Sequence, residues 1–274
     1  MIAFVLAAST LLVPPAPRPV PAVVLLPGAV SADRDGTVGV NRPFADLAEG
    51  LAERGIASIR FEGAASDDDA RVVAVREIAA AKGVDPERVF LVGHAEGAAI
   101  APRLAKRAGS VRGLVLLAPA VRAVDARMLD QVAYGAKLVG LEPADVAEQS
   151  ALLEGQFAAI KNPASGVDPG LLGHPAAYWR DVLSIDLPRA IRSTKLPVLV
   201  LHGEKDFEVR KDLDFDVLRA LLGEAKGRIA YRSFPGLNHL FMRVEGMSSG
   251  AEYGVPGHVD REVIGAIADW ILAR

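Results

Sequence analysis

The chain has 274 residues, which is enough for one large α/β domain or two small ones and for a sizeable hydrophobic core. Lys and Arg number 31 and Asp and Glu number 34, so the net charge of −3 argues against nucleic-acid and anionic-membrane partners and favours a small ligand. The absence of cysteine excludes disulfides, a thiolate nucleophile and Cys-ligated metal, but it leaves the compartment open.

The amino-terminal residues 1–13 are apolar and allow two interpretations, a first strand of the fold or an export signal. No Lys or Arg precedes Arg18, so the basic region of a signal peptide is missing, and the apolar stretch is too short to span a bilayer. We favour the strand, and with it a cytoplasmic location slightly over a secreted one.

Apolar runs without polar alternation recur along the chain, as expected for strands buried on both faces of a parallel sheet. These runs lie at 22–26, 56–61, 88–93, 113–118, 196–201 and 228–234. Helical periodicity or capping signals lie at 43–54, 66–82, 97–108 and 258–273, and Asp85-Pro86 indicates a turn before the third run. Alternating strands and helices predict an α/β fold, with a mostly parallel sheet covered by helices on both faces.

The segment between the strands ending at Ala118 and beginning at Leu196 contains no good strand pattern. Helical patterning is clearest at 130–139 and 144–160. We therefore predict one domain, residues 1–274, with a helical lid inserted at about 120–195.

The third apolar run ends in Gly93-His94-Ala95-Glu96-Gly97, where a strand stops at a glycine and a helix begins at once. Glycines at 93 and 97 allow a close crossing of strand and helix, so Ala95 is expected at the apex of a strained bend. This is the G-x-S-x-G pattern of a nucleophile elbow, with alanine where the reacting serine hydroxyl belongs.

Two later stretches place chemistry-bearing side chains at the same edge of the sheet. Asp206 follows the strand at 196–201, and His239 follows the strand at 228–234, so the chain order is elbow, acid, histidine. Other candidates for the acid and the base are less well placed: Glu204, Asp212, His174 and His258. His94 and His202 are assigned structural roles.

These three motifs make the chain resemble the α/β-hydrolases, and more narrowly the bacterial serine esterases whose elbow reads G-H-S-E-G. The resemblance extends from about Pro21 to the carboxyl end. It implies that Asp206 orients His239, which takes the nucleophile's proton and returns it to the leaving group. It also implies an oxyanion hole made by the backbone N–H groups of Ala29 and Glu96, and it implies no cofactor and no metal.

The sequence departs from this family in three places. Ala95 has no hydroxyl, so no acyl-enzyme can form through it, and roughly 10³ to 10⁴-fold catalysis over water is the most that remains. The segment after Phe61, Glu62 to Ala65, is shorter than usual. The turn Leu26 to Ala29 replaces the commoner His-Gly or Gly-Ser-Gly turn.

Three functional hypotheses follow. In the favoured one, the parent is a serine hydrolase of small carboxylic esters, and this chain carries an inactivating serine-to-alanine change at Ala95. In the second, alanine is native and the protein is a non-catalytic binder. In the third, the substrate is an amide or a thioester, as in serine aminopeptidase-like or thioesterase enzymes. The acyl and alcohol specificity, the mobility of the lid and the oligomeric state stay open.

Some residues have a plainer interpretation than a functional one. The acidic run Asp67 to Asp69 suits a helix start better than a metal site. Tyr178 and Trp179 either line a substrate pocket or pack the predicted lid against the core. The acidic residues of that segment fit a solvated helix face better than an amine site: Glu142, Asp145, Glu148 and Glu154.

Overall fold

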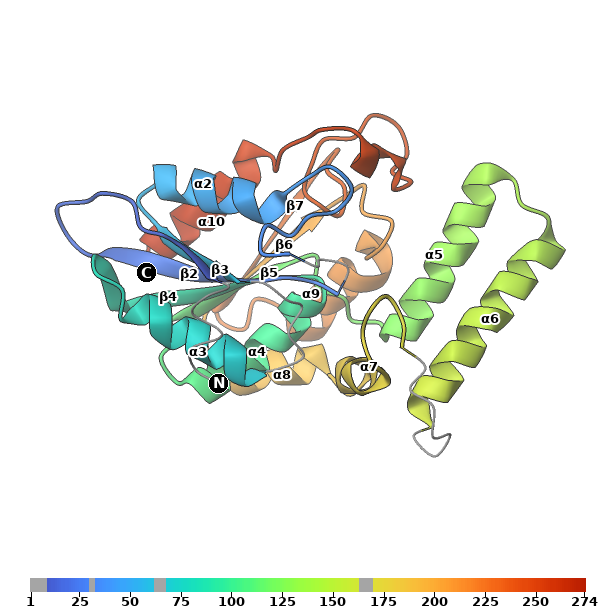
Figure 1. Cartoon of the computed structure of the whole chain (residues 1–274), viewed down its shortest axis with the longest axis horizontal. Helices are drawn as coiled ribbons and strands as arrows, with labels where there is room; N and C mark the ends of the chain where they lie inside the picture. Colours follow the sequence, from blue (N-terminus) through green and yellow to red (C-terminus); the bar gives the residue numbers. More distant parts are fainter. Residues whose placement is uncertain (1–8, 30–32, 62–67, 163–169) are drawn as a thin grey trace.

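The computed structural model describes residues 9–29, 33–61, 68–162 and 170–274, and it is built around one seven-stranded sheet. The strand order is β1-β3-β2-β4-β5-β6-β7, and only β1 runs antiparallel to its neighbour. Helices cover both faces of the sheet (Figure 1). The predicted fold class is therefore confirmed.

The strands coincide closely with the apolar runs of the sequence, because nearly every side chain of the central strands is buried. Their bounds are β1 Ser9–Leu12, β2 Val20–Leu26, β3 Ala57–Phe61, β4 Val84–His94, β5 Gly113–Leu117, β6 Val198–Gly203 and β7 Ile229–Phe234. Strand β4 differs from the prediction, since Asp85-Pro86 lies inside it. Val84 pairs with Val20 and Val89 with Ala22, so Pro86, which has no N–H, sits where the ladder is irregular.

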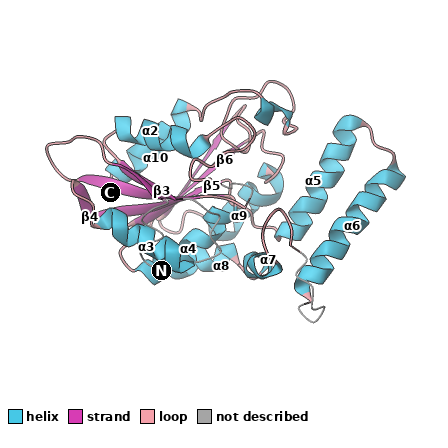
Figure 2. Ribbon diagram, viewed as in Figure 1, coloured by secondary structure: helices cyan, strands magenta, loops and turns pink. Residues whose placement is uncertain are grey.

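Two groups of helices bury the two faces of the sheet (Figures 1 and 2). One face is covered by α2 (Pro43–Glu53) and α10 (Arg261–Leu272). The other packs against α3 (Asp68–Ala79), α4 (Glu96–Ala108), α8 (Leu187–Thr194) and α9 (Asp216–Leu222), which follows η2 (Lys211–Phe215). A 3-10 turn, η3 (Ala251–Gly254), precedes α10.

The segment between β5 and β6, which we call the insertion, holds α5 (Val124–Val139), α6 (Pro143–Lys161), α7 (Ala176–Leu183) and α8. Helices α5 and α6 lie side by side beyond the edge of the sheet (Figure 1). A small apolar cluster around the fully buried Trp179 joins the insertion to Ala29, which follows β2. Packing inside the insertion is thus continuous with the loop beside the elbow.

Several predictions fall partly outside the described residues. Ser9–Leu12 forms the edge strand β1, whereas residues 1–8 lie outside the described part. The short segment Glu62 to Ala65 and the predicted helix start at Ser66 also lie outside it. Within the described residues, no helix is long and apolar enough to cross a bilayer.

Candidate active site

Ala95 stands at the apex of a sharp turn between β4 and α4, as the glycine pattern predicts. Its φ of 50° and ψ of −116° lie in a region that costs a non-glycine residue about 1–3 kcal/mol. A Cβ on Gly93 would lie 2.4 Å from the carbonyl oxygen of Gly97, and one on Gly97 would lie 2.2 Å from that of Leu26. Only glycine therefore permits this crossing of strand and helix, which holds Ala95 in its strained conformation.

Asp206 and His239 meet beyond the carboxyl ends of β6 and β7. His239 Nδ1 donates to Asp206 Oδ2 across 2.7 Å, and both side chains are buried. The other oxygen of Asp206 accepts the backbone N–H groups of Glu208, at 2.9 Å, and Val209, at 2.8 Å. The loop that carries Asp206 therefore positions its carboxylate independently of the contact with His239.

The electrostatics of this pair favour a charged imidazole. Burial alone would raise the pKa of Asp206, but the charge and hydrogen bond of His239 outweigh burial and lower it. Burial also opposes charge on His239, yet the carboxylates of Asp206 and Glu208 raise its pKa to about 9. Glu208 Oε2 lies 3.9 Å from His239 Nε2, the nitrogen that Asp206 leaves free.

His94, immediately before the apex, packs against His239. The two ring centroids are 4.4 Å apart, and His94 Nε2 donates to the carbonyl oxygen of His239 across 2.9 Å. Burial and the neighbouring His239 charge lower the pKa of His94 to about 4, so it stays neutral at physiological pH. Its contacts support the structural role assigned from the sequence, although its ring also lines the pocket.

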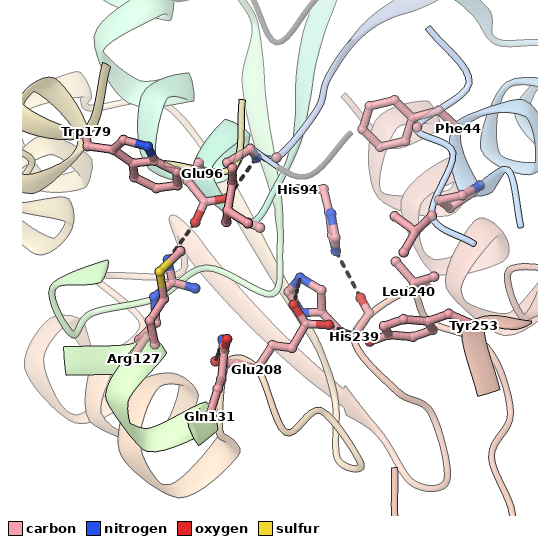
Figure 3. Close-up of a pocket in the computed structure, with 18 residues that line it drawn as sticks. Phe44, His94, Glu96, Arg127, Gln131, Trp179, Glu208, His239, Leu240 and Tyr253 are labelled. Carbon is pink, nitrogen blue, oxygen red and sulfur yellow. Dashed lines mark hydrogen bonds and ion pairs between the residues drawn. The ribbon is translucent and has the colours of Figure 1, made fainter. Parts of the chain in front are cut away.

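Ala95 lines a pocket of about 200 Å³. Figure 3 shows the side chains around this pocket. Its apolar wall includes Phe44, Met128, Leu172, Trp179 and Leu240. Its polar side chains are His94, Glu96, Arg127, Gln131, Glu208, His239 and Tyr253. The pocket thus joins residues from the sheet edge with residues of the insertion, among them Trp179, one of the two aromatic candidates.

The side chain of Glu96 was not assigned any role from the sequence. In the structure its Oε2 accepts the backbone N–H of Ala29 at 3.0 Å, and its Oε1 accepts Arg127 Nη2 at 2.6 Å. Burial would raise the pKa of Glu96, but the Arg127 charge and these hydrogen bonds lower it to about 2. Glu96 is therefore an ionised, buried carboxylate beside the elbow.

Ala29 is also held from its carbonyl side. His174 Nε2 donates to the Ala29 carbonyl oxygen at 2.7 Å, while the His174 ring stacks on Tyr178 with centroids 4.1 Å apart. Both partners of Ala29 thus depend on the insertion, since Arg127 of α5 holds Glu96 and His174 precedes α7.

Comparison with known proteins agrees with this architecture. Residues 8–246 match the family model described as alpha/beta hydrolase family. The chain belongs to that family. This α/β-hydrolase is 32% identical over 272 residues to esterase EstD of Thermotoga maritima, covering 95% of the present chain and 64% of that protein. It therefore spans less than two thirds of this relative's length.

Solved structures similar to the hydrolase support the fold. Est1E from Butyrivibrio proteoclasticus has a TM-score of 0.58 and 16% identity, covering 97% of this chain and 93% of that one. An esterase from Pyrobaculum calidifontis has a TM-score of 0.57 and 19% identity, covering 97% of this chain and 80% of that one. At such identities the similarity concerns the fold.

Apart from His174, which contacts Ala29, the other candidates lie away from the pocket. Asp212 is mostly exposed and pairs with Arg210, and Glu204 accepts the hydroxyl of Ser233. His258 is exposed and pairs with Asp46. His202 is buried, stacks on Phe215 and has a lowered pKa because of burial. The four acidic residues named above for the predicted lid are exposed.

No group of His, Asp or Glu side chains suited to a metal ion occurs among the described residues. Of the acidic run at the start of α3, Asp68 and Asp69 are described. Asp68 pairs with Arg71, Arg103 and Arg107, which ties α3 to α4.

Among the pocket residues that sequence reasoning missed are Glu208, Tyr253 and Arg127. Glu208 lies two positions after Asp206, and this proximity is a signal that could have identified it. Tyr253 donates its hydroxyl to Glu208 Oε1 at 2.5 Å from a distant loop, and Arg127 belongs to α5. Arg127 lies in no motif that would mark it, whereas Tyr253 lies in the carboxy-terminal stretch that carries part of the family resemblance but was given no role.

Proposed function

We propose that the hydrolase is a serine-type esterase of small carboxylic esters whose nucleophile position holds an inactivating alanine, Ala95. The observation that carries this proposal is the strained apex of Ala95 in one pocket with His239, whose Nδ1 is bound to Asp206. A binding protein has no evident need for a strained residue and a buried acid–base pair together.

With serine at position 95, the reaction would use the residues present. His239 would accept the hydroxyl proton as the serine oxygen adds to the ester carbonyl carbon. Collapse of the tetrahedral intermediate would break the bond to the alcohol, which takes the proton from His239. Water would then attack the acyl-enzyme with His239 again as base, releasing the carboxylic acid and restoring the serine.

The pocket favours a short substrate. A volume of about 200 Å³ with walls formed by Phe44, Trp179 and Leu240 suits a short acyl chain or an aryl group. The esterases among the similar proteins agree with this class without specifying the substrate.

One observation favours a second candidate, in which alanine is native and the chain is a non-catalytic binder. The N–H of Ala29, assigned to the oxyanion hole, already donates to the Glu96 carboxylate. A protein without acyl transfer has no need to keep that donor free.

Adding a serine hydroxyl at position 95 tests the proposal. We expect the Ala95→Ser variant to be labelled by a fluorophosphonate and to hydrolyse a short-chain aryl ester. The matched control is Ala99→Ser, which adds a hydroxyl one turn further along α4, outside the residues that line the pocket, and should stay unlabelled.

An Ala95→Ser variant that is neither labelled nor active on a broad ester panel would overturn the esterase proposal in favour of the binder. Thioesters and aminoacyl anilides on the same panel decide between ester, thioester and amide substrates. Faster turnover of either than of the matched ester would replace the ester assignment.

A further inference from the structure

One of the two backbone N–H groups assigned to the oxyanion hole already has an acceptor. The Glu96 carboxylate accepts the N–H of Ala29 at 3.0 Å through its Oε2. Figure 3 shows Glu96 among the residues that line the pocket, with a dashed line to Arg127. A charged oxygen of the protein therefore uses a donor that a substrate oxyanion would need.

This carboxylate lies beside the nucleophile position. A Cβ built on Gly28 would be 3.1 Å from Ala95 Cβ and 3.2 Å from Glu96 Oε2, so Glu96 Oε2 and the Ala95 methyl group border the same small space. A tetrahedral oxyanion formed at position 95 would meet a like charge at close range. Substrate oxygen and Glu96 carboxylate cannot both use the Ala29 donor.

We propose that the Glu96 carboxylate occupies the oxyanion hole of the free protein and is displaced when a substrate carbonyl oxygen enters, while Arg127 retains it. This inference rests on the proposed esterase function. It makes Glu96 and Arg127 positioning residues that act through the donor at Ala29.

Arg127 is placed to hold the displaced carboxylate. It binds the oxygen of Glu96 that is not used by Ala29, and both side chains are about nine-tenths buried. Loss of the Ala29 hydrogen bond would therefore leave Glu96 paired, and the Arg127 charge would offset the carboxylate near a developing oxyanion. Because Arg127 lies on α5, the opening of the hole depends on the position of the insertion.

The test uses phenylboronic acid on the full chain with Ala95→Ser. The serine oxygen adds to boron, its proton passes to His239, and the resulting tetrahedral anion needs the oxyanion donors. We expect Glu96→Ala in this background to bind the boronate about tenfold more tightly, since no charged hydrogen bond has to be broken. Glu96→Gln should lie between the two, because its amide oxygen can accept the Ala29 N–H without carrying a charge.

The Arg127→Met variant tests whether Arg127 retains the displaced Glu96 carboxylate or only stabilises the fold. With Glu96 present, it should weaken boronate binding about threefold to tenfold, because the displaced carboxylate loses its partner. With Glu96→Ala present, no carboxylate is displaced, so Arg127→Met should weaken binding less, through loss of its positive charge alone. The control Arg54→Met, which removes an exposed ion pair with Asp269 away from the pocket, should change boronate affinity in neither background.

The outcomes distinguish the two proposals. Failure of the Ala95→Ser variant itself to bind boronate and fluorophosphonate overturns the esterase proposal and the displacement with it. Boronate binding that is weakened or unchanged by both Glu96 substitutions, in variants whose thermal unfolding shows a folded protein, overturns the displacement alone. Equal weakening by Arg127→Met in both backgrounds would also overturn it.

Discussion

The histidine side and the oxyanion side of the candidate site differ in how they are held. On the histidine side, the β6 loop supplies two N–H groups to Asp206, and Asp206 holds His239. On the oxyanion side, Ala29 is held by Glu96 and His174, whose own partners Arg127 and Tyr178 belong to the insertion.

This difference indicates that the oxyanion side of the site can change its conformation, whereas the histidine side is fixed. Asp206 and His239 need only the ends of two neighbouring strands, so their geometry follows from the sheet. The donor at Ala29 contacts the charged Glu96 side chain, which substrate displaces in the mechanism we propose. In that mechanism a preformed base faces an oxyanion hole whose state depends on the insertion.

The largest expected effect comes from the histidine side. In the Ala95→Ser background, Asp206→Asn should lower kcat about 10⁴-fold, because the amide no longer selects the required tautomer of His239 or stabilises its imidazolium. The measurement is steady-state hydrolysis of the aryl ester. Asp212→Asn, which alters a mostly exposed carboxylate on the same connection, is the control and should retain the parental rate. Equal rates for the two variants would contradict the assignment of the acid.

On the oxyanion side, His174→Phe in the same background should lower kcat/KM about tenfold, less than the loss of a donor itself. Phenylalanine keeps a ring to stack on Tyr178 but removes the hydrogen bond to the Ala29 carbonyl. The exposed His258→Phe is the matched control and should leave kcat/KM unchanged. A His174→Phe enzyme as fast as its parent would show that Ala29 needs no support from the insertion.

A smaller effect is expected in the pH profile. His239 acts as a base only when neutral, so the rate of the Ala95→Ser enzyme should rise with pH as His239 loses its proton, near its pKa of about 9. Besides Asp206 and Glu208, the groups facing His239 are Glu96 and the neutral His94. Glu208→Gln removes one negative charge, which should lower the pKa of His239 and raise the rate at pH 7 about threefold to tenfold.

The pH–rate profile of kcat/KM is the readout for this change. Glu204→Gln, on the same loop but bound to Ser233, should leave the profile where it was. An unchanged pH–rate profile in Glu208→Gln would show that the Glu208 charge does not raise the pKa of His239.

The smallest effect concerns the strained apex. Ala95→Gly should raise the free energy of unfolding by up to about 1 kcal/mol, because glycine adopts this backbone conformation without the steric cost of a Cβ. Ala99→Gly, within α4, should lower it by about 0.5–1 kcal/mol, since glycine is a poor helix former. Urea unfolding of both variants measures whether the free energy of unfolding changes in opposite directions. A decrease in both variants would argue against strain at Ala95.

Much of the fold could be predicted because its signals are local. Apolar runs predicted the six parallel strands, and Gly93 and Gly97 predicted the bend that raises Ala95. The irregularity at Pro86 was missed, because a strand with an interrupted ladder looks like a turn before a strand. Helix α9 was also missed, since its seven residues are too few for a clear periodicity.

The sequence by itself determined the family, the order of elbow, acid and histidine, and the meeting of Asp206 with His239, because strand ends in a parallel sheet lie at one edge. Only the tertiary structure decided that Glu96 turns its carboxylate toward Ala29, that Glu208 faces His239 and that His174 holds Ala29. These contacts join residues far apart in the chain through side-chain directions, which depend on how the insertion packs beside the elbow. No local pattern encodes them.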